Sequence, residues 1–206
     1  MRDEKISDFL HRLADRVPAP GGGASAALHA AQAAALLGMV ARYSTGAAYA
    51  AHERDIATII AETDTLRAAA LRLAEDDAAA FTAVTDAYKL PKDTDEAKAA
   101  RSAAIAEALV GAARPPAEVI AVAQAAIGFA ERLLPIGNRN VVTDVAAAAE
   151  AARAAATTAR VNIEINLGGV RDDAFRAELT AEAAKVDDLA ARAEQVTAAV
   201  RAEIAK

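Results

Sequence analysis

Apolar residues recur every three or four positions along most of this 206-residue chain, and this period limits the possible folds more than any other feature. Hydrophobic residues make up 54% of the sequence but aromatic residues only 3%, because alanine supplies much of the apolar content. Alanine is the best helix former, and its small side chain lets helices approach closely. The sequence therefore predicts an all-α array of closely packed helices, in one domain over residues 1–206.

Capping residues, glycines and prolines divide the chain into about seven helices. The first four predicted helices cover residues 6–17, 25–43, 52–88 and 94–113. A fifth opens at Pro115-Pro116, a sixth is capped by Thr143, and the last covers residues 172–204. The helix over 52–88 is unusually long for a globular protein. Six residues of the last helix are expected to face inward: Phe175, Leu179, Val186, Leu189, Val196 and Val200.

Residues 161–167, Val-Asn-Ile-Glu-Ile-Asn-Leu, depart from this pattern because apolar and polar residues alternate. Such a period of two is typical of a half-buried strand. No other segment alternates convincingly, so a strand here would have no partner. We expect the segment to be helical or irregular.

Composition excludes several classes of function. The net charge of −6 and the absence of a basic stripe argue against nucleic-acid binding. The chain has no cysteine, which excludes disulfides, thiolate zinc sites and thiol catalysis. Its three histidines lie in different segments without metal-ligand spacing, so we expect no metal site.

The first residues and the apolar segments indicate a soluble protein. The opening Met-Arg-Asp-Glu-Lys is charged and no apolar run follows it, so we expect no export signal. The apolar stretch over 24–43 is interrupted by His29 and Gln32, and its alanines contribute little transfer free energy. We expect no membrane span and a cytoplasmic location.

Asp77 is the most unusual residue of the long third helix. It lies in the middle of a stripe with spacings of three and four that is otherwise expected to be buried: Leu66, Ala70, Leu73, Ala80, Phe81, Val84 and Tyr88. Burial raises the pKa of a carboxyl group, and an acid with a raised pKa is suited to general acid or base catalysis. The alternative is that Asp77 pairs with an arginine of a neighbouring helix as a structural contact.

Three consecutive glycines, Gly21, Gly22 and Gly23, precede the second predicted helix. Free backbone N–H groups at a helix N-terminus can bind an anion such as a carboxylate. The stretch is neither a P-loop nor a dinucleotide-binding motif, because no Gly-Lys-Ser/Thr follows it and no strand precedes it. From spacing alone, a tight turn is favoured over an anion site.

Six short motifs carry a resemblance to a known family: Pro20-Gly-Gly-Gly23, Asp77-Ala-Ala-Ala-Phe81, Leu90-Pro-Lys92, Gly137-Asn138, Thr143-Asp144 and Ile165-Asn-Leu167. With these motifs in this order, the chain resembles the formiminotetrahydrofolate cyclodeaminase and methenyltetrahydrofolate cyclohydrolase family over nearly its whole length. The resemblance implies an all-helical homodimer that binds a folate. Bifunctional relatives carry a formiminotransferase domain before this one, whereas we expect this chain to stand alone, with a separate formiminotransferase as a candidate partner.

The resemblance also implies the roles of individual residues. Asp77 corresponds to the aspartate that is held to be catalytic in the family. Residues implied in substrate binding are Pro20, Gly21, Gly22, Gly23, Ser25, Lys92, Asn138, Asp144 and Asn166. The family needs no metal and no tightly bound cofactor, because a tetrahydrofolate derivative is the substrate. One departure is Ala24, which stands where the family commonly has serine.

Two reactions are compatible with a single catalytic carboxylate. The first is hydrolysis of 5,10-methenyltetrahydrofolate to 10-formyltetrahydrofolate. The second is cyclodeamination of 5-formiminotetrahydrofolate to 5,10-methenyltetrahydrofolate, with release of ammonia. We expect one of these reactions, with Asp77 as general acid or base and the hydrolase slightly favoured. The alternative is a non-catalytic folate-binding or scaffold protein of the same fold.

Overall fold

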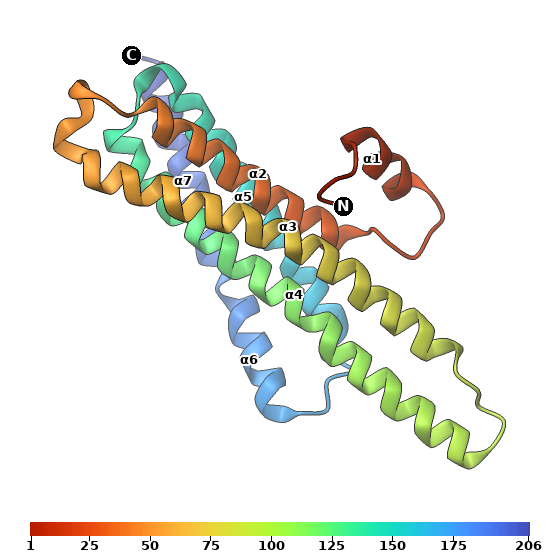
Figure 1. Cartoon of the computed structure of the whole chain (residues 1–206). Coiled ribbons are helices and arrows are strands. Elements are labelled where there is room, and N and C mark those ends of the chain that lie inside the picture. The colour runs from red at the N-terminus through yellow and green to blue at the C-terminus, as the bar shows by residue number, and fades with distance from the viewer.

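The computed structural model describes all 206 residues, which form long antiparallel helices and no strand (Figure 1). The α-helices are α1 (Ile6–Ala14), α2 (Gly22–Tyr43), α3 (Glu53–Lys89), α4 (Asp95–Ile136), α5 (Val142–Leu167), α6 (Asp173–Ala184) and α7 (Val186–Ile204). Two short 3-10 helices, η1 (Ala47–His52) and η2 (Arg139–Val141), complete the chain. The all-α prediction is confirmed.

Small side chains form the centre of the bundle, where α2 packs against α3, α4 and α5. Most of the buried residues of α2 and α5 are alanines, and many of them are completely inaccessible to solvent. Isoleucine and leucine side chains fill the space between helices, among them Leu37, Ile59, Ile120 and Ile163. Alanine-rich faces thus allow close helix packing, as the composition predicts.

The bundle has two ends that matter for function. At the first, which we call the glycine end, Gly22 and Gly23 of α2 lie beside Asp77 of α3 and Asn162 of α5. At the opposite end, which we call the η end, the last turn of α2 lies beside η1 and η2. The hairpin of α3 and α4 projects beyond the glycine end, and α1 stands apart from the bundle (Figure 1).

The prediction that Pro115-Pro116 opens a new helix is wrong. Both prolines lie buried inside α4, which runs without a break over 42 residues and exceeds the 37 residues of α3. Proline removes a backbone donor and disfavours the helical conformation of the residue before it. Here the long segments on both sides of the prolines are held against α3 and α5, so that tertiary packing outweighs this local cost.

The last predicted helix is in fact two, α6 and α7, with Lys185 between them. No proline or glycine marks this break, so the sequence carried no signal for it. The inward residues are nevertheless confirmed, since Leu179, Val186, Leu189, Val196 and Val200 are buried, while Phe175 is partly buried. Residues 161–167 are helical and form the end of α5, which confirms that they are not a strand.

Two predicted apolar faces are less buried than expected. The first helix ends at Ala14 rather than before Pro18, and Ile6 and Leu10 are exposed because α1 stands apart from the bundle. On α3, Phe81 and Tyr88 are 47% and 53% exposed. These two residues lie on the projecting hairpin, beyond the start of α2, where α2 no longer covers α3.

Length and composition alone would allow α2 and α4 to cross a membrane. Core helices of soluble proteins meet the same two criteria. Most of the apolar stretch of α2 is buried inside the bundle, as is much of that of α4.

Candidate functional site

Asp77 faces the N-terminus of α2 from the middle of α3. The contact is so close that a Cβ atom at Gly23 would overlap the Asp77 carboxylate, whereas a Cβ atom at Gly22 would have no neighbour nearer than 3.9 Å. Asp77 is partly buried and forms no ion pair. The structural alternative, a pairing of Asp77 with an arginine, is therefore not what the fold contains.

Burial raises the pKa of the Asp77 carboxyl group above its usual value. A hydrogen bond from the Ala24 backbone amide acts in the opposite direction, because it stabilises the ionised form. The positive end of the α2 dipole also favours the anion. Burial is the larger effect, so the direction predicted from the sequence is confirmed.

The first turn of α2 presents backbone donors to this carboxylate. No side chain caps the helix, and its first internal hydrogen bond runs from the Ser25 amide to the Gly21 carbonyl at 3.0 Å. The amides of Gly22, Gly23 and Ala24 therefore have no partner within the helix. Because the helix begins at Gly22 rather than Ser25, Gly22 and Gly23 belong to its first turn and Gly21 is its N-cap, so the glycines do not form a separate tight turn.

Asn162 is a polar residue at this end that the sequence reasoning missed. Its Nδ2 atom lies 3.9 Å from the position that a Cβ atom would take at Gly22, and it donates to the Thr158 carbonyl at 2.9 Å. Asn166, which the resemblance implies in substrate binding, lies one turn further along α5 and donates to the Asn162 carbonyl at 2.8 Å. The helical alternative expected for residues 161–167 puts both asparagines on one face, since they are four residues apart.

Pro20 also lies near Asp77 in the structure. It is buried and lines a pocket together with Ala78 and Ala79, the two residues that follow Asp77 on α3. The structure thus brings together Asp77, Pro20, the first turn of α2 at Gly22–Ala24 and, through Asn162, the end of α5, while Gly21 and Ser25 flank this turn.

Asn138 and Asp144 lie at the η end instead. Asn138 donates from its amide to Ser44 Oγ at 2.8 Å and from Nδ2 to the Tyr43 carbonyl at 2.9 Å, which ties the α4–α5 connection to the last turn of α2. The length of α2 puts this contact about 30 Å from Gly22. Within one chain, neither Asn138 nor Asp144 can contact a reacting group that lies at Asp77.

Lys92 is separate from both groups. It lies exposed in the connection between α3 and α4, at the tip of the projecting hairpin. The helical rise from Asp77 to the end of α3 is about 18 Å, so Lys92 can contact only a distant part of a ligand that reacts at Asp77.

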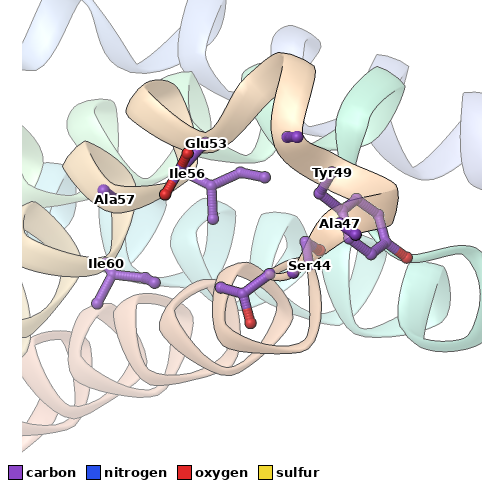
Figure 2. A pocket seen from close by; sticks show the side chains of 10 residues that line it. Ser44, Ala47, Tyr49, Glu53, Ile56, Ala57 and Ile60 are labelled. Atoms are coloured by element: carbon purple, nitrogen blue, oxygen red, sulfur yellow. The ribbon is translucent and has the colours of Figure 1, made fainter.

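A pocket of about 390 Å³ lies at the η end, between η1 and the first turns of α3 (Figure 2). Its walls are mostly apolar, with Ile56 and Ile60 from α3 and Tyr49 from η1, and Glu53 is the carboxylate among its lining residues. Gly46, which follows α2, has a φ of 95° and permits the sharp turn into η1. This pocket is remote from Asp77.

The glycine end is therefore the better candidate for chemistry. It combines a partly buried, unpaired carboxylate of raised pKa with free backbone amides and asparagine side chains. A carboxyl group of raised pKa is suited to exchanging protons with a bound substrate. No three histidine, aspartate or glutamate side chains gather as a metal site would require.

Comparison with known proteins places the chain in a family. The formiminotransferase-cyclodeaminase family model matches residues 5–185. A methenyltetrahydrofolate cyclohydrolase of Methylorubrum extorquens is 40% identical over 177 residues, which cover 85% of each chain. A formimidoyltransferase-cyclodeaminase of Sus scrofa is 36% identical over 84% of this chain, but over only 32% of that longer protein. The crystal structure of a formiminotetrahydrofolate cyclodeaminase from Thermotoga maritima superimposes with a TM-score of 0.87, at 27% identity and 98% coverage of each chain. The chain therefore belongs to the formiminotransferase-cyclodeaminase family.

Proposed function

We propose that this protein hydrolyses 5,10-methenyltetrahydrofolate to 10-formyltetrahydrofolate, with Asp77 as general base and then general acid. The observation that carries the proposal is the unpaired carboxylate of Asp77 against the open N-terminus of α2. The 40% identity to a methenyltetrahydrofolate cyclohydrolase, over most of both chains, favours this reaction over the alternatives.

The reaction needs one group that first accepts and then donates a proton. Ionised Asp77 takes a proton from water as the water oxygen attacks the methenyl carbon between N5 and N10. Asp77 then gives this proton to N5 as the bond between N5 and the carbon breaks. Loss of the hydroxyl proton to solvent leaves the formyl group on N10, so that one proton is released in each turnover. A raised pKa suits both steps, since the two protonation states then lie closer in free energy at neutral pH.

The surrounding groups would hold the substrate rather than react with it. The free amides of Gly22 and Gly23 can donate hydrogen bonds to ring oxygen or nitrogen acceptors, because no side chain blocks the approach to the helix. Asn162 and Asn166 can donate to and accept from a pterin ring. Water, the carboxylate and backbone donors supply the proposed chemistry, so it requires no metal ion or tightly bound cofactor.

Cyclodeamination of 5-formiminotetrahydrofolate is the second candidate. It passes through a similar tetrahedral carbon, with N10 in place of water as nucleophile and ammonia as leaving group. The structural similarity to the Thermotoga maritima cyclodeaminase favours it. In that case a separate formiminotransferase would supply the substrate. A non-catalytic folate-binding role is the remaining alternative.

We also propose that two copies of the chain form a dimer. The exposed apolar side chains Ile6 and Leu10 on α1 and Val161 and Ile165 on α5 support it, since unpartnered apolar side chains often mark contact surfaces. A role for Asn138 and Asp144 in substrate binding depends on such a dimer, because only a second copy could bring them to Asp77.

Absorbance of the methenyl group tests the proposed activity. Purified protein should accelerate the loss of methenyltetrahydrofolate absorbance over buffer, and Asp77→Asn should abolish the acceleration. Formation of methenyltetrahydrofolate from the formimino compound would identify the cyclodeaminase. Calorimetric binding of a folate without turnover of either substrate would favour the non-catalytic role, and equal rates for wild type and Asp77→Asn would remove Asp77 from the mechanism.

A further inference from the structure

A pocket on the projecting hairpin differs in charge from the rest of this acidic protein. It has a volume of about 310 Å³ and lies between the end of α3, α4 and the α5–α6 connection. Arg101 and Arg171 line it, and no aspartate or glutamate does. Four other pockets, which lie at the η end, beside Pro20, at the start of α3 and along α6, each contain a carboxylate. The pocket is thus positive in a chain of net charge −6.

Neither arginine is neutralised by an ion pair. Arg101 donates from Nε and Nη2 to the Tyr88 carbonyl at 3.3 and 3.1 Å, and its guanidinium lies 5.5 Å from the centre of the Tyr88 ring. Arg171 donates from Nη2 to Ser102 Oγ at 3.0 Å. Each guanidinium therefore keeps unused N–H donors, and these are suited to a carboxylate.

The pocket is aligned with Asp77 along α3. Tyr88 lies eleven positions after Asp77, which is about three helical turns and about 16 Å, so both residues lie on the same face. Phe81 lies on this face one turn after Asp77, with its ring 47% exposed. The end of α5 also connects the site at Asp77 to this pocket, because Gly168 and Gly169, which line the pocket, follow closely after Asn166.

These distances match an extended molecule with a carboxylate end. In a folate, the reacting carbon is joined through N10 to a benzoyl ring and then to a glutamate, whose carboxylates lie on the order of 10 Å or more from that carbon. The length of the arginine side chains covers the remaining distance from the pocket.

Building on the proposed function, we propose that Arg101 and Arg171 bind the glutamate carboxylates of the folate, while the benzoyl ring lies along Phe81. The pocket then holds the glutamate end of the substrate, and Asp77 lies at the reacting carbon beside the pterin ring. The arginines act on substrate binding and not on the chemical step.

Two substrates that differ only in the glutamate test this assignment. Methenyltetrahydropteroate has the same pterin and benzoyl groups as methenyltetrahydrofolate but lacks the glutamate. Arg101→Gln and Arg171→Gln should each raise KM for methenyltetrahydrofolate about tenfold and leave kcat unchanged, since each removes a charge-assisted contact. Neither variant should change KM for the pteroate. Arg201→Gln, at the exposed end of α7, is the matched control and should change neither value.

Equal effects on both substrates, or no effect on either, would overturn the assignment while leaving the proposed activity intact. If the wild type turns over neither substrate, binding of a folate fragment tests the glutamate subsite separately from the proposed hydrolase activity. Calorimetry should then detect p-aminobenzoylglutamate but not p-aminobenzoate, and Arg171→Gln should weaken the binding about tenfold. Absence of fragment binding to wild type would refute the subsite. Thermal unfolding of each variant shows that it is folded.

Discussion

Gly23 and the Asp77 carboxylate touch so closely that no other residue fits at position 23 without moving Asp77. We therefore predict that Gly23→Ala displaces the carboxylate and lowers the free energy of unfolding by about 1–3 kcal/mol, as overpacking does. Activity should fall with it. Chemical denaturation and the methenyl absorbance assay measure the two effects.

Gly22→Ala is the matched control for this prediction. A Cβ atom there has no neighbour nearer than 3.9 Å, and alanine is a better helix former than glycine. This variant should keep the wild-type stability or exceed it. If Gly22→Ala and Gly23→Ala lose stability to the same extent, the contact between Gly23 and Asp77 is not as close as described.

Asp77→Asn should make the protein more stable at neutral pH although it removes activity. The pKa of Asp77 is raised by burial, so the folded state binds its proton more tightly than the unfolded state does. Wild-type stability is therefore fully present below the unfolded pKa near 3.8 and decreases as pH rises through the folded pKa. Asparagine has no charge to bury and avoids this loss.

The pH dependence of thermal unfolding tests whether Asp77→Asn is more stable than the wild type, as predicted. The melting temperature of Asp77→Asn should exceed that of wild type at pH 7, and the difference should vanish on acidification toward the unfolded pKa. A variant that is less stable than wild type at pH 7 would contradict an unpaired, desolvated carboxylate. We expect kcat to fall by about 10²- to 10⁴-fold, the usual contribution of a general acid or base.

The rate of the wild-type enzyme should itself report the pKa of Asp77. As a general base, Asp77 must be ionised, so kcat/KM should rise with pH through its pKa. Because burial raises that pKa, the midpoint should lie above the value of an ordinary aspartate. Rates corrected for the buffer reaction at each pH give the midpoint, and a midpoint at the ordinary value would argue that Asp77 is hydrated in the active enzyme.

Asn162 and Asn138 should respond differently to alanine. Asn162 lies beside Gly22, and its loss should lower kcat/KM about tenfold by removing one hydrogen bond to the substrate. The Asn138 side chain donates from Nδ2 to the Tyr43 carbonyl and accepts at Oδ1 from the Asn140 amide, and loss of these two hydrogen bonds should lower the free energy of unfolding by about 1–2 kcal/mol. Steady-state kinetics with denaturation curves separate the two outcomes. A raised KM in Asn138→Ala would indicate that a second copy brings Asn138 to the site.

Helical period and capping residues were sufficient to predict most of the fold. Thr94 caps α4, with its Oγ1 accepting from the Ala97 amide at 3.1 Å, and Gly46 follows α2 with a positive φ. The predicted cap at Thr143 is wrong, because α5 begins one residue earlier, at Val142, and no side chain caps it. The path of α4 through Pro115-Pro116 was not predictable, because it depends on packing against α3 and α5. Local rules describe the cost of proline but not what offsets it.

The candidate site was predictable where one residue broke a local pattern. Asp77 interrupts an apolar stripe, and its raised pKa follows from that position. Asn162 was missed because it lies in a segment whose alternation obscured its helical face. The separation of Asn138 from Asp77 depends on the antiparallel arrangement of long helices, which motif order along a chain does not reveal.

Ile165 provides a test of the proposed dimer. Its side chain is 78% exposed near the end of α5, and Val161, one turn before it, is 59% exposed. A glutamate at position 165 would put a charge into any contact that covers this surface, and burying an unpaired charge is strongly unfavourable. Ile165→Glu should therefore shift the molecular mass measured by light scattering from two chains to one. Ala147→Glu, on an exposed position nearer the start of α5, should leave the mass at two chains. A wild-type protein of one chain at micromolar concentration would refute the dimer, and a dimeric Ile165→Glu would show that the contact lies elsewhere.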